Sequence, residues 1–98
     1  MNWSEEILNK TKQFGVLGYA LSKCLNILDL GDVKEAEYIE EWNTYGSAVR
    51  KSYQKGEDYR DFAFDSKLFD MAKGGDVRAM KMFEDRIKQQ RLKKIKGI

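Results

Sequence analysis

The sequence contains no proline and no histidine, and its single cysteine is Cys24. Because proline breaks helix interiors, its absence together with many helix-forming residues predicts an all-α chain. Without histidine, neither a Ser-His nor a Cys-His nucleophile pair can form. One cysteine allows neither an internal disulfide nor a tetrahedral thiolate zinc site. The acid pairs Glu57-Asp58 and Glu84-Asp85 are typical of solvated helix faces. We therefore expect no catalytic activity, no metal and no cofactor.

Long apolar runs are also absent. No stretch approaches the ~20 residues that cross a bilayer, and the opening segment MNWSEEILNK is too acidic for a signal peptide. Cys24 lies in an apolar helical segment, where a small buried side chain is the simplest interpretation, and an unpaired thiol fits a reducing compartment. We expect a soluble intracellular protein of one compact domain, because the chain has 98 residues.

Charge is unevenly distributed along the chain. Residues 1–86 hold 13 basic and 16 acidic side chains, whereas residues 87–98 hold five basic side chains and no acidic one. Attraction for phosphate should therefore concentrate at the C-terminal end, on Lys88, Arg91, Lys93, Lys94 and Lys96.

Three short helices are predicted first. Ser4 caps a helix that ends near Phe14, with Gly15 as its stop and Trp3 folded over its apolar side. A second helix covers about residues 17–28, and its apolar stripe includes Leu17 and Cys24. A third covers about residues 33–43, with Asp32 as N-cap. Its apolar side is predicted to hold Val33, Ala36, Trp42 and either Tyr38 or Ile39, and its outer side is acidic, with Glu35, Glu37, Glu40 and Glu41.

Two longer helices are predicted to follow and to form an antiparallel hairpin. Ser47 caps a helix over residues 48–73, and Asp76, after Gly74 and Gly75, caps another over residues 77–94. Their packing sides are predicted to contain Val49, Tyr53, Gly56, Ala63, Leu68, Met71, Ala79, Met80, Phe83 and Ile87. Gly56 has three interpretations: a kink, a break into two helices, or close approach of another backbone.

The resulting organisation is a three-helix unit over residues 1–46, a helical hairpin over residues 47–94 packed against it, and a basic frayed tail over residues 95–98. The first three helices and the short turn at residues 29–32 are arranged as in a helix-turn-helix unit.

This order resembles the terminase small subunits of tailed bacteriophages. In that family a helix-turn-helix precedes a Tyr-x-x-Gly, matched here by Tyr53 and Gly56. A Leu-x-x-x-Ala-x-x-Gly-Asp-x-x-Ala phrase follows. The residues that match this phrase are Leu68, Ala72, Gly75, Asp76 and Ala79. In the family an aromatic or aliphatic residue and then an arginine follow, matched here by Phe83 and Arg86. The similarity covers about residues 14–86.

The resemblance implies a non-enzymatic protein that binds viral double-stranded DNA, assembles as a homo-oligomeric ring and assists the terminase large subunit in the cytoplasm of an infected bacterium. On this interpretation, DNA would contact Lys88, Arg91, Lys93, Lys94, Lys96, Ser22 and Lys23. Assembly would use Tyr53, Gly56, Tyr59, Phe62 and Phe69 wherever these side chains lie outside the intramolecular core.

Two other functions are compatible with the sequence. The acidic third helix would be repelled by DNA in the major groove, so it could instead dock a basic protein, as in an adaptor, an inhibitor or a virion component. A helix-turn-helix transcription regulator is the third possibility.

Overall fold

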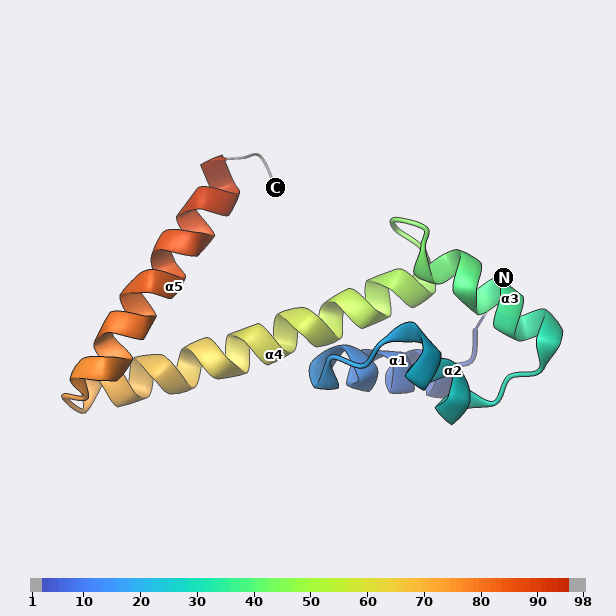
Figure 1. The fold of residues 1–98 in the computed structure, drawn as a ribbon, viewed down its shortest axis with the longest axis horizontal. Coiled ribbons are helices and arrows are strands. Elements are labelled where there is room, and N and C mark those ends of the chain that lie inside the picture. Colours follow the sequence, from blue (N-terminus) through green and yellow to red (C-terminus); the bar gives the residue numbers. More distant parts are fainter. Residues whose placement is uncertain (1–2, 96–98) are drawn as a thin grey trace. The chain divides into compact units, whose positions relative to one another are not determined.

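The computed structural model describes residues 3–95, without the side chains of residues 94 and 95, and this part of the chain is entirely helical outside its turns. Figure 1 shows its helices in chain order. They are α1 (Glu5–Leu17), α2 (Leu21–Leu28), α3 (Asp32–Trp42), α4 (Ala48–Lys73) and α5 (Val77–Ile95). The predicted all-α class, with three short helices ahead of a long one, is confirmed.

Spatial contacts group the chain into two units, residues 1–60 and residues 61–98, so the limit between them falls inside α4. The domain boundary after residue 46 stays a prediction.

Buried aromatic rings form the core of the N-terminal unit. Trp3, Tyr38 and Val49 make one cluster, and Phe14, Cys24 and Tyr53 make a second. Leu28 and Trp42 pack against both clusters. The predicted burial of Cys24 is confirmed, since none of its surface is exposed.

A buried hydrogen bond joins α1 to α3 within this core. The hydroxyls of Thr11 and Tyr38 are 2.8 Å apart, and both residues are fully buried. Thr11 Oγ1 also donates to the carbonyl of Ile7 at 2.8 Å. Burial raises the pKa of Tyr38 to about 12. These polar groups are therefore satisfied inside the core, as buried hydroxyls need to be.

Gly15 does not end α1, contrary to the sequence prediction. The helix continues to Leu17 and ends at Gly18, which has a φ of +72°. Gly15 lies against α4, where a Cβ atom on it would overlap the carbonyl of Tyr53. Likewise, a Cβ atom on Gly56 would overlap the carbonyl of Lys12 and stand 2.9 Å from Gly15 Cα. Of the three interpretations of Gly56, close backbone approach is therefore correct, and α4 is unbroken.

Helices α2 and α3 also differ from their predicted limits. Leu17 lies in the last turn of α1 with 60% of its surface exposed, and α2 begins only at Leu21. Asp32 is the first residue of α3, and Gly31 at φ +85° occupies the cap position. The rotation of α3 buries Tyr38 and leaves Val33 74% exposed and Ala36 exposed as well, so the assignment of Val33 and Ala36 to the apolar side was wrong.

The caps predicted around α4 and α5 are confirmed. Ser47 Oγ accepts from the amide of Arg50 at 3.1 Å, and Asp76 Oδ1 accepts from the amide of Ala79 at 3.0 Å. Between the two helices, Gly75 has a φ of +93°, a conformation that glycine adopts without the penalty of a Cβ atom. These local interactions place the start of α5 directly after the end of α4.

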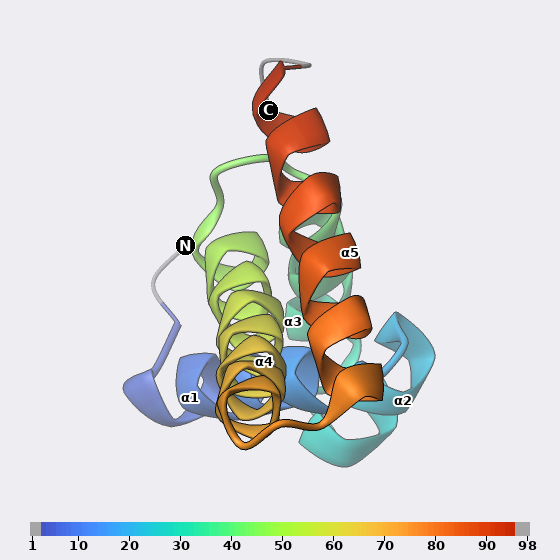
Figure 2. The same cartoon turned by 90° about the vertical axis from the view of Figure 1, so that its left-hand side faces the viewer.

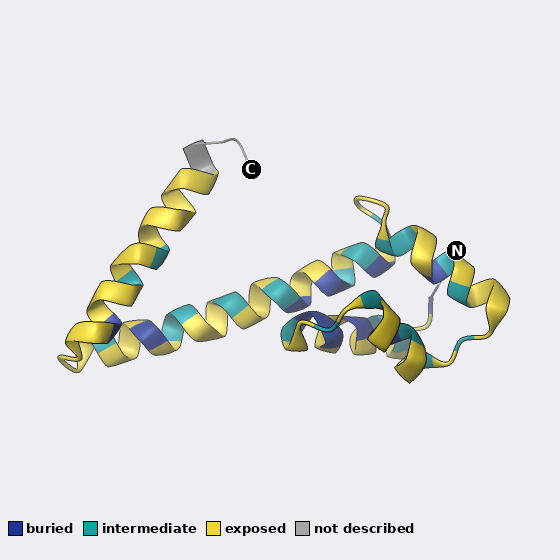
Figure 3. Cartoon of the chain, viewed as in Figure 1, coloured by how far each residue is buried: buried dark blue, intermediate teal, exposed yellow. Residues whose placement is uncertain are grey.

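The C-terminal unit, in contrast, has little core. Helix α5 turns back at an angle from the end of α4, and the two helices meet at the glycine corner (Figures 1 and 2). Among the described side chains of this unit, Leu68 and Ala79 are the buried apolar ones. Figure 3 shows that α5 is exposed along most of its length. Four residues of the predicted packing side are exposed, contrary to the sequence prediction: Ala63, Met71, Met80 and Ile87.

Candidate functional site

An arginine clamp joins the two helices of the C-terminal unit. Arg86 Nε donates to Asp65 Oδ1 at 2.6 Å, Arg86 Nη2 donates to Asp65 Oδ2 at 3.3 Å, and Asp61 Oδ1 lies 3.9 Å from Nη2. The hydrogen bond to Asp65 raises the pKa of Arg86. The guanidinium also lies 5.4 Å from the ring centroid of Phe64. Because its charge is compensated by two carboxylates, Arg86 is better suited to holding α5 than to binding a ligand.

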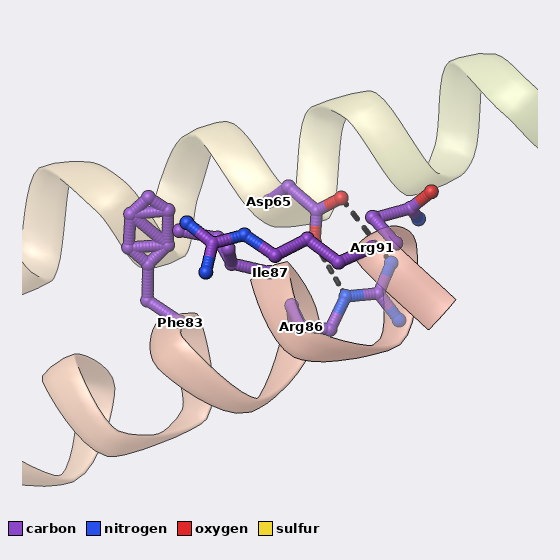
Figure 4. A pocket seen from close by; sticks show the side chains of 6 residues that line it. Asp65, Phe83, Arg86, Ile87 and Arg91 are labelled. Carbon is purple, nitrogen blue, oxygen red and sulfur yellow. Dashed lines mark hydrogen bonds and ion pairs between the residues drawn. The ribbon is translucent and has the colours of Figure 1, made fainter. Parts of the chain in front are cut away.

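A hollow of about 220 Å³ lies beside this clamp (Figure 4). It is lined by Asp65, Phe83, Arg86, Ile87, Gln90 and Arg91. The ring of Phe83 is 5.3 Å from that of Phe69 in an edge-to-face arrangement. Phe83 and Ile87 form the apolar part of this wall, and Arg91 is its charged residue outside the clamp.

The predicted DNA-binding residues of α5 lie on more than one side of the helix. Lys88 and Arg91 line a shallow hollow with Glu84 and Ile87, whereas Lys93, two residues after Arg91, is turned by about 200° from it. All three cations are exposed. The side chain of Lys94 and the whole of Lys96 lie outside the described residues. The structure thus brings Lys88 and Arg91 together but does not gather all the basic side chains on one face.

Ser22 and Lys23 lie in the first turn of α2 and are both exposed. Lys23 Nζ is 4.1 Å from the ring centroid of Tyr19, so a cation–π contact holds the lysine close to the surface. Both side chains remain accessible to a ligand.

Two of the predicted assembly residues belong to the intramolecular core. Tyr53 is 7% exposed, its hydroxyl donates to the Tyr19 carbonyl at 2.8 Å, and its ring centroid is 4.4 Å from that of Trp42. Burial raises the pKa of Tyr53. Gly56 is covered by the backbone of α1. Neither residue is available as part of a surface between copies, because each is already used within the N-terminal unit.

The other three predicted assembly residues are exposed: Tyr59 by 57%, Phe62 by 68% and Phe69 by 45%. Among the exposed apolar side chains that sequence reasoning did not single out are Phe64 and Met82, each 48% exposed. Phe64 lies seven residues before Met71, and Met82 lies three residues after Ala79. Both spacings indicate one side of a helix, but they do not tell whether that side is buried or exposed.

Exposed apolar side chains lie along two different flanks of the C-terminal unit. Successive helical residues are turned by about 100°, so Phe62 and Phe64 point to opposite sides of α4. Flank 1 contains Phe62 and Phe69 of α4 with Met80 and Ile87 of α5. Flank 2 contains Phe64 and Met71 of α4, which line a second hollow with Lys67 and Leu68. By helical spacing it also contains Met82 of α5.

The acidic side of α3 is partly turned inward, contrary to the prediction of an outer acidic face. Glu41 accepts a hydrogen bond from Trp3 Nε1 at 2.6 Å and lies 3.4 Å from the amide of Val49. Glu37 Oε2 is buried without a partner among the described residues. Glu40 is exposed. Glu41 is therefore bonded to the core of its own unit and Glu37 has a buried oxygen, which weakens an acidic docking surface.

Within residues 3–95, no group of three or more acidic or cysteine side chains is placed to hold a metal ion, and no helix there is long and apolar enough to cross a membrane.

The chain was also compared with known proteins. No protein-family model, no curated protein and no solved structure matches it.

Proposed function

We propose that this chain is a DNA-packaging protein of the terminase small subunit kind. In this proposal it binds viral double-stranded DNA without catalysing a reaction, assembles as a ring of identical copies and presents the DNA to the large subunit in the infected bacterial cell. The proposal is supported by the order of the helices, by the Gly75-Asp76 corner and above all by the two exposed apolar flanks of residues 61–95.

The flanks support self-assembly through the energy of burial. Fully burying one phenylalanine or methionine contributes about 1.5–3 kcal/mol, so several such side chains left in water favour association. A unit whose buried apolar side chains, among those described, are Leu68 and Ala79 gains more from a partner than from its own core.

The presence of two flanks favours a ring over a dimer. A two-fold dimer uses the same patch on both copies and would leave the other flank in water. Pairing flank 1 of one copy with flank 2 of the next is a head-to-tail contact, which repeats until it closes.

DNA contact is assigned to the exposed cations of α5, with Ser22 and Lys23 as a second location. Phosphate binding by Lys88 and Arg91 releases counterions, so affinity for duplex DNA should fall steeply as salt increases. Salt-insensitive binding would contradict this assignment.

Two substitutions test the assembly directly by native mass spectrometry. Phe69→Asp alters flank 1, Phe64→Asp alters flank 2, and Lys81→Asp, on the side of α5 away from Ala79, is the control. We expect wild type and the control to form closed oligomers and each flank variant to be monomeric. Mixing the two flank variants should restore one intact pairing and give a one-to-one dimer.

A monomeric wild-type chain would contradict the proposed assembly. Flank variants that still form the full oligomer would contradict the assignment of its interface. In both cases the adaptor or regulator alternatives would become preferable.

A further inference from the structure

We propose that the loop between α3 and α4, with the first turns of α4, binds single-stranded nucleic acid by stacking a base on Tyr45. This site lies entirely in the N-terminal unit, away in sequence from the cations assigned above to duplex DNA. The inference does not depend on the proposed packaging function.

Tyr45 is the first observation that supports the site. Its side chain is fully exposed, whereas the other aromatic residues around it, Trp42 and Tyr53, are in the core. The ring stands on a loop next to Gly46, whose φ is +82°. The ring is therefore free to stack on a planar partner.

A hollow beside the ring is the second observation. It measures about 220 Å³ and is lined by Tyr45, Gly46, Arg50, Lys51 and Gln54. No acidic residue lines it. Gln54 is an amide that can donate to or accept from a base edge, although its Nε2 also donates to Asp58 at 3.2 Å.

The charge around this hollow is the third observation. Residues 45–55 contain Arg50, Lys51 and Lys55 and no acidic side chain. Arg50 lies over the rings of Trp42 and Tyr53, at 5.6 and 5.8 Å from their centroids, so it is held in place by cation–π contacts. In the described part of the chain none of the three cations has a carboxylate within ion-pair distance. Their charges are thus available to an anion.

Glu41, at the end of α3, does not cancel this charge. The carboxylate of Glu41 is turned toward Trp3 and the amide of Val49. The hydroxyl of Ser47 donates to the Glu41 carbonyl at 2.6 Å and accepts from the Arg50 amide, which fixes the loop against the start of α4.

An exposed ring beside uncompensated cations is the arrangement that binds unpaired nucleotides: the ring stacks on a base and the cations contact the phosphates on either side. Bases in a duplex are stacked on one another, so Tyr45 can act only where a strand is single or an end has opened. The cations alone would bind phosphates of either a duplex or a single strand. The aromatic ring adds a preference for an unstacked base, so we assign the ligand as single-stranded.

The experiment measures fluorescence anisotropy of labelled oligo(dT) with the full chain. Tyr45→Ala should weaken binding about 5- to 150-fold, the effect of losing one base stack, and Tyr45→Phe should restore it. Lys51→Glu should weaken binding and reduce its salt dependence. Lys34→Glu, an exposed lysine on α3, is the matched charge control and should have a much smaller effect.

Several results would overturn the inference: no binding of oligo(dT) by the wild type, equal affinity of Tyr45→Ala and wild type, or an equal loss in Lys34→Glu. An equal loss of blunt-duplex binding and of oligo(dT) binding in Tyr45→Ala would also overturn it, because a stacked base in a duplex is not available to the ring. Oligo(U) run in parallel distinguishes RNA from DNA as the preferred strand. Because duplex binding through α5 is measured separately, failure here leaves the packaging proposal standing, and the reverse also holds.

Discussion

At the scale of single residues, Gly15 and Gly56 determine how closely α1 and α4 approach. Neither has a positive φ, so neither is needed for backbone conformation. Both are needed for space, because backbone atoms of the opposite helix occupy the position of a side chain. Gly75, by contrast, is needed for backbone conformation, since its φ is +93° and no atom beyond its chain neighbours lies within 4 Å of the position of a Cβ atom.

Gly56→Ala should therefore destabilise the N-terminal unit. The new Cβ atom would overlap backbone of α1, which cannot move as a side chain can, so we expect a loss of about 1–3 kcal/mol or more in the free energy of unfolding. Urea denaturation followed by circular dichroism measures it. Gly74→Ala is the control, because there a Cβ atom would be 3.4 Å from the Met71 carbonyl and the φ is not positive. A Gly56→Ala protein as stable as Gly74→Ala would contradict the assigned crossing.

At the scale of helices, the Arg86 clamp adds a polar contact to the apolar packing of α4 against α5. In the bidentate contact, the side chain of Arg86 is 29% exposed and that of Asp65 is 32% exposed. Asp61 and the ring of Phe64 also contact the guanidinium. Beside it, the edge-to-face contact of Phe69 and Phe83 supplies the main aromatic packing between the helices. The clamp is the contact whose loss should release α5.

A double-mutant cycle with Arg86→Met and Asp65→Asn should give a coupling free energy of about 1 kcal/mol. The reason is that two parallel hydrogen bonds between guanidinium and carboxylate stabilise more than a single exposed ion pair does. The cycle with Lys73→Met and Asp70→Asn is the control. That pair is 3.9 Å apart and 62% and 74% exposed, so a coupling of about 0.3 kcal/mol is expected. Urea denaturation of the four proteins in each cycle provides the comparison. Equal couplings in the two cycles would mean that α5 is held by something other than the clamp.

At the scale of the whole molecule, stability should depend on protein concentration. Assembly through the two flanks would stabilise the folded chain by mass action, so the thermal midpoint should rise as the protein is concentrated. Calorimetry over a wide dilution series measures this shift. Phe69→Asp should remove the concentration dependence, and a wild-type midpoint that stays constant on dilution would argue against assembly.

The parts of the fold that depend on near neighbours in the chain were predictable. The caps at Ser47 and Asp76, the corner at Gly74-Gly75 and the unbroken span of α4 each rest on residues within one or two helical turns. The candidate surfaces were less predictable. The sequence assigned five residues to an assembly surface only where they lie outside the core, and it could not tell that Tyr59, Phe62 and Phe69 are exposed whereas Tyr53 and Gly56 are buried.

By itself, the sequence determined that the described chain is helical and that Ser4, Ser47 and Asp76 cap helices, because backbone hydrogen bonds and conformational preferences act locally. Only the tertiary structure decided which side of each helix is buried. A rotation of one residue, about 100°, exchanges Tyr38 for Ile39, and the crossing of two glycines depends on atoms forty residues apart. The exposure of the flanks in the C-terminal unit and of Tyr45 likewise follows from how the helices meet, which no single helix encodes.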